Sequence, residues 1–316
     1  MATTRPARVI TSGFVALDVV LDTASRAAAG GTAANVAVAL RSFGWDASIV
    51  GTLGDDPAGR FICQDLVAAG LDTSKLQLDE SWNTPVVLQE SRGGDHAWRF
   101  ICPQCGTRFA KHRPSRPEVA AAIIDSVAPP DVFFFDRASL FTLKLAVAWR
   151  AAGSLVVFEP ASLGRPLLFE RAVSAADIVK YSAQRATSVE DAARGAPGAL
   201  VRTLGPDGLE FRVMRGTRWH HVPVVPVANV VDSAGAGDWT TAGLVDVLRR
   251  DFGTSVRQAL VRTEALALAL SAAQRWGARA CQWRGARPDA TVKTSPAQSH
   301  LKVVPDVNNL VCAKSG

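Results

Sequence analysis

Residues 231–243 read VDSAGAGDWTTAG and place two glycines and an aspartate where a helix should begin, because an apolar run with helical spacing follows them. Glycine in a helical turn is less favourable than alanine by about 1 kcal/mol, so helix stability does not explain the pair. The N–H groups of a first helical turn are unpaired, and small residues let an anion approach them closely. Gly235, Ala236 and Gly237 therefore predict an anion pocket with Asp238 at its edge. The alternative is an ordinary first-turn carboxylate after a flexible loop.

Such a pocket needs a rigid scaffold, and the rest of the chain alternates strand-like and helix-like segments. The chain has 316 residues, of which 48% are hydrophobic and 20% charged, a balance typical of a globular protein that can bury a full core. Nearly continuous apolar runs are typical of strands covered on both faces. Strands are expected at 8–13, 47–52, 132–135, 155–158, 178–180 and 199–203, and helices at 32–43, 59–69 and 255–276. We therefore predict an α/β fold with a doubly wound, mostly parallel central sheet and helices on both faces.

The pattern changes between the second and third of these strands. Residues 85–90 and 96–101 are β-rich and flank the turn Arg92-Gly93-Gly94-Asp95, which is a hairpin signal. Antiparallel strands inserted into an α/β chain are a candidate lid. The C-terminal tail is polar, contains two prolines and is expected to be poorly ordered. The resulting boundaries are 1–290 for the α/β domain, about 82–112 for its β-rich lid and 291–316 for the tail.

Composition and charge argue against several classes of protein. The formal net charge of +6 comes without any block of five or more Lys and Arg residues, so it indicates solubility and attraction for nucleotides rather than a nucleic-acid partner. The apolar stretch 9–21 is similar to a secretory signal, but Asp18 interrupts it, and no run is long enough to span a membrane. The five cysteines are an odd number, which favours a reduced, cytoplasmic protein over a disulfide framework.

Two separated segments together resemble the signatures of the PfkB (ribokinase-like) family of carbohydrate kinases. GGTAANVA at 30–37, followed by FG at 43–44 and VGTLGDDPAG at 50–59, is similar to the first signature. DSAGAGDW at 232–239 is similar to the second, in which Asp, Thr, any residue and Gly-Ala-Gly-Asp occur in that order. The resemblance covers about residues 8–288, and two signatures flanking a strand-rich insertion are a much stronger signal than either alone.

The resemblance implies a role for each part of the site. Asp238 would take the proton of an acceptor hydroxyl, while Gly235, Ala236 and Gly237 would hold the charge of the transferring phosphoryl group. This agrees with the chemistry, because phosphoryl transfer depends mainly on positioning and charge neutralisation. The sugar-binding residues implied are Asp18, Gly30, Gly31 and Asn35, and the nucleotide-binding residues are Ser182, Arg185, Thr203, Gly205, Gly208 and Asp232. Without the family pattern, Asp18 would be a turn residue, Asn35 an ordinary polar helix residue, and 203–208 a hairpin turn.

The segment Asp177 to Arg185 departs from the family in the sign of one charged residue. Relatives often have Asn, two residues and Glu here, a motif that helps to arrange Mg²⁺ and phosphate. Ser182 replaces the Asn, as in fructokinase-type members, but Arg185 replaces the Glu and reverses its charge. The guanidinium would either bind phosphate oxygens or turn to solvent. The alternative to an active kinase is therefore a PfkB-fold ligand-binding or regulatory protein with weak or lost kinase activity.

Cys102-Pro-Gln-Cys105-Gly106 is half of a zinc ribbon. A structural zinc ion needs four ligands, and the candidates near these cysteines are His96 and His112. Because the second cysteine pair of a ribbon is missing, the sequence favours a reduced tight turn that folds without metal. Two tryptophans near the lid, Trp82 and Trp98, either cover a sugar face or pack the lid.

Together these features predict an ATP-dependent kinase that phosphorylates a primary hydroxyl of a small sugar or a nucleoside. The expected cofactor is Mg²⁺, and a monovalent cation is compatible with the family. The expected partners are the acceptor and ATP, with no membrane and no nucleic acid, and a homodimer is compatible with the sequence.

Overall fold

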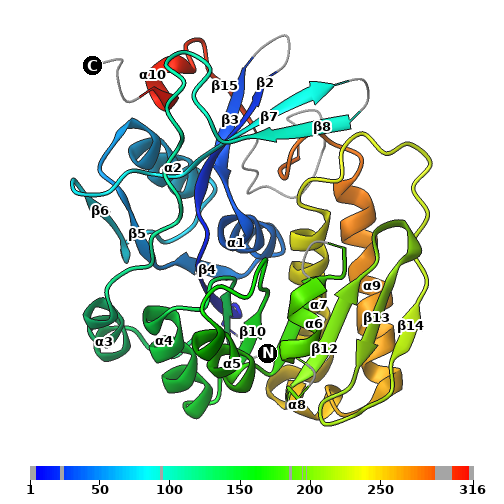
Figure 1. Cartoon of the computed structure of the whole chain (residues 1–316). Coiled ribbons are helices and arrows are strands. Elements are labelled where there is room, and N and C mark those ends of the chain that lie inside the picture. Colours follow the sequence, from blue (N-terminus) through cyan, green and yellow to red (C-terminus); the bar gives the residue numbers. More distant parts are fainter. Residues whose placement is uncertain are drawn as a thin grey trace.

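The computed structural model describes residues 5–21, 25–92, 95–184, 187–193, 195–196, 198–288 and 301–312. Within these residues the main feature is an eight-stranded sheet of order β14-β13-β12-β11-β10-β9-β1-β4 (Figure 1). Neighbouring strands from β4 to β12 run parallel, and β13 and β14 extend the sheet in antiparallel fashion. The strands are β1 (Arg8–Ser12), β4 (Asp46–Ile49), β9 (Val132–Phe135), β10 (Leu155–Phe158), β11 (Ile178–Ser182), β12 (Ala199–Thr203), β13 (Leu209–Arg212) and β14 (His220–Val222).

Helices cover both faces of this sheet, as the continuous apolar strands predicted. Every residue of β9 is buried, and Phe134 lies in one core cluster while Phe133 and Phe135 lie in the other, because alternate strand residues face opposite sides. One face carries α1 (Thr32–Ser42), α7 (Ala236–Phe252), α8 (Val256–Ala259) and α9 (Thr263–Ala280), and the other carries α3 (Pro117–Ser126), α4 (Leu140–Ala151), α5 (Pro166–Ala175) and α6 (Thr187–Ala193). The doubly wound α/β prediction is confirmed.

A smaller sheet lies beyond one end of the large one (Figure 1). Its order is β15-β3-β2-β7-β8, and β7 and β8 form the predicted hairpin. The small sheet extends beyond this hairpin, because β2 pairs with β7 and β3 pairs with β2. These strands are β2 (Ala16–Leu21), β3 (Arg26–Gly30), β7 (Val86–Arg92), β8 (Asp95–Arg99) and β15 (Lys302–Val303).

Two predicted elements are divided in the structure. The expected strand 47–52 leaves the large sheet at Val50, and β5 (Gly51–Gly54) pairs instead with β6 (Leu76–Asp79). The expected helix 255–276 is interrupted between α8 and α9, where the Leu260 carbonyl accepts a hydrogen bond from the Met214 N–H at 2.8 Å. In both places a contact distant in sequence outweighs the local pattern.

The C-terminal segment packs against the rest of the chain. β15 pairs antiparallel with β3, and Nζ of Lys302 lies 2.9 Å from the carboxylate of Asp65 in α2 (Pro57–Ala68). α10 (Asn308–Val311) packs against α2. The expectation of a poorly ordered tail therefore does not hold for residues 301–312. Among the described helices, none is long and apolar enough to cross a membrane.

Candidate active site

The N-terminus of α7 has the geometry that its sequence suggested. Gly235 caps the helix with a φ of 76°, in the left-handed region, and a Cβ there would lie 2.7 Å from the Cα and Cβ of Ala286. The Trp239 indole N–H donates to the Ala286 carbonyl at 2.9 Å and fixes the same contact. Backbone conformation and packing therefore both require glycine at position 235. A Cβ on Gly237 would instead meet ordinary van der Waals distances.

Asp238 lies in the first turn of α7 and contacts a residue from the N-terminal half of the chain. The Asn35 side chain donates from Nδ2 to Oδ2 of Asp238 at 2.7 Å, across 203 residues of sequence. Asn35 is buried in α1, and its Oδ1 has no hydrogen-bond partner among the described residues. A buried, unpaired amide oxygen is costly unless a ligand satisfies it. The pair thus offers a bound hydroxyl one acceptor on the amide and one on the carboxylate.

Asp18 lies in β2 directly against the end of β3. A Cβ on Gly30 would overlap the Asp18 carboxylate, and a Cβ on Gly31, whose φ is 85°, would overlap the Phe14 carbonyl. These overlaps explain why two glycines precede α1. The structure thus brings together Asp18, Gly30 and Gly31 on the lid side of α1, with Asn35 one helical turn further on.

The charge state of Asp18 is set by its burial. Burial raises its pKa from 3.8 to about 7, although the nearby Arg287 guanidinium and the Gly31 N–H both favour the ionised form. Arg287 is itself buried, donates to the Ala29 carbonyl and pairs with Asp65 at 3.5 Å. The Asp18 carboxyl group therefore gains and loses its proton near neutral pH.

A buried ion pair beneath the anion pocket was missed by the sequence reasoning. Nζ of Lys180 lies 2.5 Å from Oε1 of Glu159, and the Thr241 hydroxyl donates to Oε2 of Glu159, also at 2.5 Å. A Cβ on Gly237 would lie 3.6 Å from this Nζ and 3.8 Å from Oε1. Glu159 comes directly after the apolar run of β10, so a polar residue at the end of a buried strand was the available signal.

Asp136 is likewise a polar residue directly after a buried strand, here β9. It is fully buried, accepts from the Phe14 N–H at 2.7 Å and pairs with Arg137 at 2.8 Å. Burial raises its pKa to about 6, with Glu159 adding to the increase while Arg137 opposes it. Charged groups thus directly follow two neighbouring parallel strands, β9 and β10, at the edge of the sheet where α/β proteins bind ligands.

Four of the six predicted nucleotide-binding residues lie on adjacent strands and the turn after them. Ser182 in β11 is in register with Thr203 in β12, and Ser182 shares a face of its strand with Lys180. Gly205 and Gly208 form the turn with φ values of 64° and 89°. Arg185, on which the sequence departs from its family, lies outside the described residues.

Asp232 is buried and holds the backbone around the anion pocket. It accepts from the Ala234 N–H at 2.9 Å, from the Gly285 N–H at 2.9 Å and from Nε2 of Gln89 at 2.5 Å. Because Gln89 belongs to β7, the carboxylate connects the lid to the start of α7. Its direct contact with a nucleotide stays a prediction.

One hollow adjoins these residues, and a larger one lies away from them. The smaller, of about 290 Å³, is lined by Asp18, Gln89, Trp98, Ala286 and Arg287, among others. Asp18 represents the predicted sugar residues in its lining, and Ala286, which also lines it, lies against Gly235. Trp98 thus lies where it could cover a sugar.

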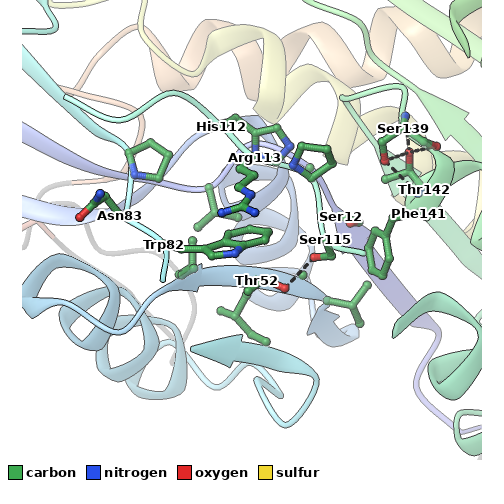
Figure 2. Close-up of a pocket in the computed structure, with 18 residues that line it drawn as sticks. Ser12, Thr52, Trp82, Asn83, His112, Arg113, Ser115, Ser139, Phe141 and Thr142 are labelled. Carbon is green, nitrogen blue, oxygen red and sulfur yellow. Dashed lines mark hydrogen bonds between the residues drawn. The ribbon is translucent and has the colours of Figure 1, made fainter. Parts of the chain in front are cut away.

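The larger hollow, of about 490 Å³, lies elsewhere (Figure 2). In it the Arg113 guanidinium lies 4.7 Å from the centre of the Trp82 ring, and Thr52 and Ser115 share a hydrogen bond of 2.8 Å. None of the described residues predicted for the active site lines it. Trp82 is therefore packed beneath Arg113, away from the Asp18 hollow.

The model for the pfkB family carbohydrate kinases matches residues 9–287. The fructokinase of Klebsiella pneumoniae is 28% identical over 284 residues, covering 81% of this chain and 87% of its own. The aminoimidazole riboside kinase of Salmonella typhimurium is 27% identical over 248 residues, covering 70% and 74%. The crystal structure of Xylella fastidiosa fructokinase with bound ATP superimposes with a TM-score of 0.70 at 23% identity, covering 88% and 93%.

The fold is that of the ribokinase-like α/β proteins. The chain belongs to the pfkB family of carbohydrate kinases, since the family model covers most of its length. It is accordingly an ATP-dependent carbohydrate kinase.

Proposed function

We propose that this kinase transfers the γ-phosphate of ATP to a primary hydroxyl of a small sugar or a nucleoside, with Asp238 as the base. The observation that carries the proposal is the 2.7 Å hydrogen bond from Asn35 to Asp238. It joins the side of the site that holds the acceptor to the anion pocket that receives the phosphoryl group. The named activities of the Klebsiella and Salmonella relatives, on fructose and on a riboside, support the substrate class.

The proposed step is a direct displacement. Asp238 accepts the proton of the acceptor hydroxyl as its oxygen forms a bond to the γ-phosphorus, and the bond from that phosphorus to the β–γ bridging oxygen breaks to release ADP. The N–H groups of residues 235–237 neutralise charge on the transferring oxygens. Asp238 lies in the first turn of α7, where the helix dipole favours a negative charge.

The described residues fit a magnesium ion bound mainly through phosphate and water. Magnesium prefers oxygen ligands and retains several waters. The Glu159 carboxylate beside the anion pocket supplies such oxygens, but it is already paired with Lys180. Bound Mg²⁺ would neutralise charge on the phosphates. A monovalent cation and a cytoplasmic setting also belong to the proposal.

Substitution of Asp238 by Asn tests the base. In a coupled ADP-release assay over a panel of sugars and nucleosides, we expect Asp238→Asn to lower kcat on the best acceptor by about 10²–10⁴-fold while ATP affinity stays within a few fold. The control is Asp251→Asn, which removes an exposed carboxylate near the other end of α7. A variant that retains more than a tenth of the wild-type kcat would exclude Asp238 as the base. A wild-type protein that binds ATP and acceptor without turnover would favour the binding-protein alternative.

A further inference from the structure

Three cysteine side chains converge behind the lid. Cys102 and Cys105 lie in the turn that follows β8, and Cys312 ends α10. Their Sγ atoms all lie within 4.8 Å of one another. Around a tetrahedral zinc ion with Zn–S distances of about 2.3 Å, sulfur atoms are about 3.8 Å apart. Small side-chain movements would therefore bring the three sulfur atoms to the separations that binding one zinc ion requires.

The turn that carries two of these thiols is tightly hydrogen-bonded. The Cys102 N–H donates to the Thr107 carbonyl at 2.8 Å, and the Gly106 N–H donates to the Cys102 carbonyl at 3.0 Å. Gly106 has a φ of 71°, a conformation that favours glycine. The turn thus holds its two cysteines in place without a metal ion.

Several polar groups in this turn donate hydrogen bonds to sulfur. The Gln104 and Cys105 N–H groups donate to the Cys102 sulfur, and the N–H and hydroxyl of Thr107 donate to the Cys105 sulfur. Donors of this kind orient the sulfur atoms, as the outer hydrogen-bonding groups of metal sites do for the ligands.

The third thiol is delivered by the C-terminal segment. β15 pairs with β3, α10 packs on α2, and the Cys312 N–H donates to the Asn308 carbonyl at 2.8 Å, so Cys312 is fixed independently of the turn. Cys312 is buried beside the other two sulfurs. The histidines that the sequence offered as ligands do not enter this cluster: His112 lies edge-on to Phe14 and lines the larger hollow, and the His96 side chain lies outside the described part of the chain.

We propose that Cys102, Cys105 and Cys312 form a three-thiolate binding site for Zn²⁺. Soft thiolate ligands select zinc over magnesium or calcium, and tetrahedral zinc would take a water molecule as its fourth ligand because Gly106 and Thr107 are exposed to solvent. Binding releases the thiol protons and involves no change in oxidation state. This site is separate from the phosphoryl-transfer site, and the proposal does not depend on the acceptor of the kinase.

A zinc ion here would join the C-terminal segment to the chain that follows the lid. His112, Arg113 and Ser115, which line the larger hollow, come soon after Cys105 (Figure 2). The ion would therefore restrain one wall of that hollow as well as the C-terminus. Sequence reasoning could not find it, because no spacing rule relates Cys312 to Cys102.

The experiment uses the full-length protein, reduced and stripped with a chelator. On titration with Co²⁺ we expect a thiolate-to-cobalt charge-transfer band that saturates at about one ion per chain and is abolished by one equivalent of Zn²⁺. Zinc affinity, measured by competition with a chromophoric chelator, should fall at least about 100-fold in Cys312→Ser and in Cys105→Ser, since each removes a direct ligand. The control is Cys63→Ser, which removes a cysteine in α2 and should leave zinc affinity unchanged.

Several outcomes would overturn the proposal. One is a reduced wild-type protein that takes up no zinc or cobalt, and another is equal zinc affinity in wild type and Cys312→Ser. A third is a disulfide between two of the three cysteines whose reduction restores the thiols without metal uptake, which would make the cluster a redox site. If Cys312→Ser does not fold, Cys105→Ser decides, because Cys105 is only partly buried and lies in a surface turn.

Discussion

At the scale of single residues, the unusual side chain is Asp18, which remains protonated to a higher pH in the folded protein than in the unfolded chain. Its pKa rises from 3.8 to about 7 because burial outweighs Arg287 and the Gly31 N–H. Protonated Asp18 therefore loses its proton less readily in the folded protein than in the unfolded chain. The resulting contribution to the free energy of unfolding is lost as the pH rises through about 7. The ionised group, however, can accept hydrogen bonds on both of its oxygens, and charge makes these hydrogen bonds stronger than those to the protonated group.

These opposite effects give a prediction for Asp18→Asn. Between about pH 6 and pH 8, wild-type acceptor affinity should rise while the midpoint of thermal unfolding falls, and both trends should be weaker in the variant. Asp136, whose pKa is about 6, is present in both proteins, so the difference between them isolates Asp18. Calorimetric binding of the acceptor and thermal melts at three pH values provide the measurement. Parallel pH profiles in the two proteins would show that Asp18 does not titrate in this range.

The residues of the site differ in how far the sequence predicted them. Asp238 and Asn35 carry family motifs, and the structure brings them into direct contact. Glu159 and Lys180 belong to no motif that was used, and their pairing depends on strand order, which a single sequence does not reveal. Arg185 stays a prediction, because it lies outside the described residues.

At the scale of elements, the start of α7 shows that its two glycines have different functions. Gly235 has a positive φ and lies against Ala286, whereas Gly237 is helical and open to an added methyl group. The sequence predicted that both glycines serve close approach to phosphate. The contact with Ala286 could not be predicted, because that residue lies 51 positions further along the chain and approaches only in the folded state.

Alanine substitutions separate the two functions. Gly235→Ala should lower the free energy of unfolding by about 1–3 kcal/mol, because the new side chain is strained and overlaps Ala286. Gly237→Ala should leave stability equal or higher, since alanine is the better helix former. It should nevertheless lower kcat, because the methyl group narrows the anion pocket. Urea unfolding and kinetics on both variants test this, and equal losses of stability would contradict the distinction.

Long-range pairing also explains which elements the sequence described correctly. The buried strands β9 and β10 coincide with their apolar runs, because their composition alone excludes solvent exposure. β2 was not predicted as part of the lid, since it pairs with β3 and β7, and the pairing rather than the local pattern defines the small sheet. The same reason accounts for the division of the helix expected at 255–276.

At the scale of the whole molecule, the C-terminal segment packs against the small sheet and α2. Asp65 in α2 is fully buried and accepts from the Ala29 N–H of β3 at 2.9 Å. Its carboxylate also lies 3.5 Å from Arg287 and 2.9 Å from Lys302 of β15. Arg287 is in turn close enough to Asp18 to lower the pKa of the Asp18 carboxyl group. A series of neighbouring charged groups therefore extends from the predicted sugar residues to the C-terminal segment. Lys302 is the outermost member and the one that solvent reaches.

Removing Lys302 should therefore loosen the segment without disrupting the core. We expect Lys302→Met to lower the free energy of unfolding by about 1 kcal/mol, because Asp65 keeps Arg287 and the Ala29 N–H while the half-exposed lysine contributes only a screened interaction. The change should also increase hydrogen exchange at β15 and at its partner strand β3, where the backbone pairing depends on the docked segment. The control is Lys144→Met, which removes an exposed lysine on α4. Equal effects of the two substitutions on stability, or unchanged exchange at β3, would show that Lys302 does not hold the segment in place and that its docking depends on α10 alone.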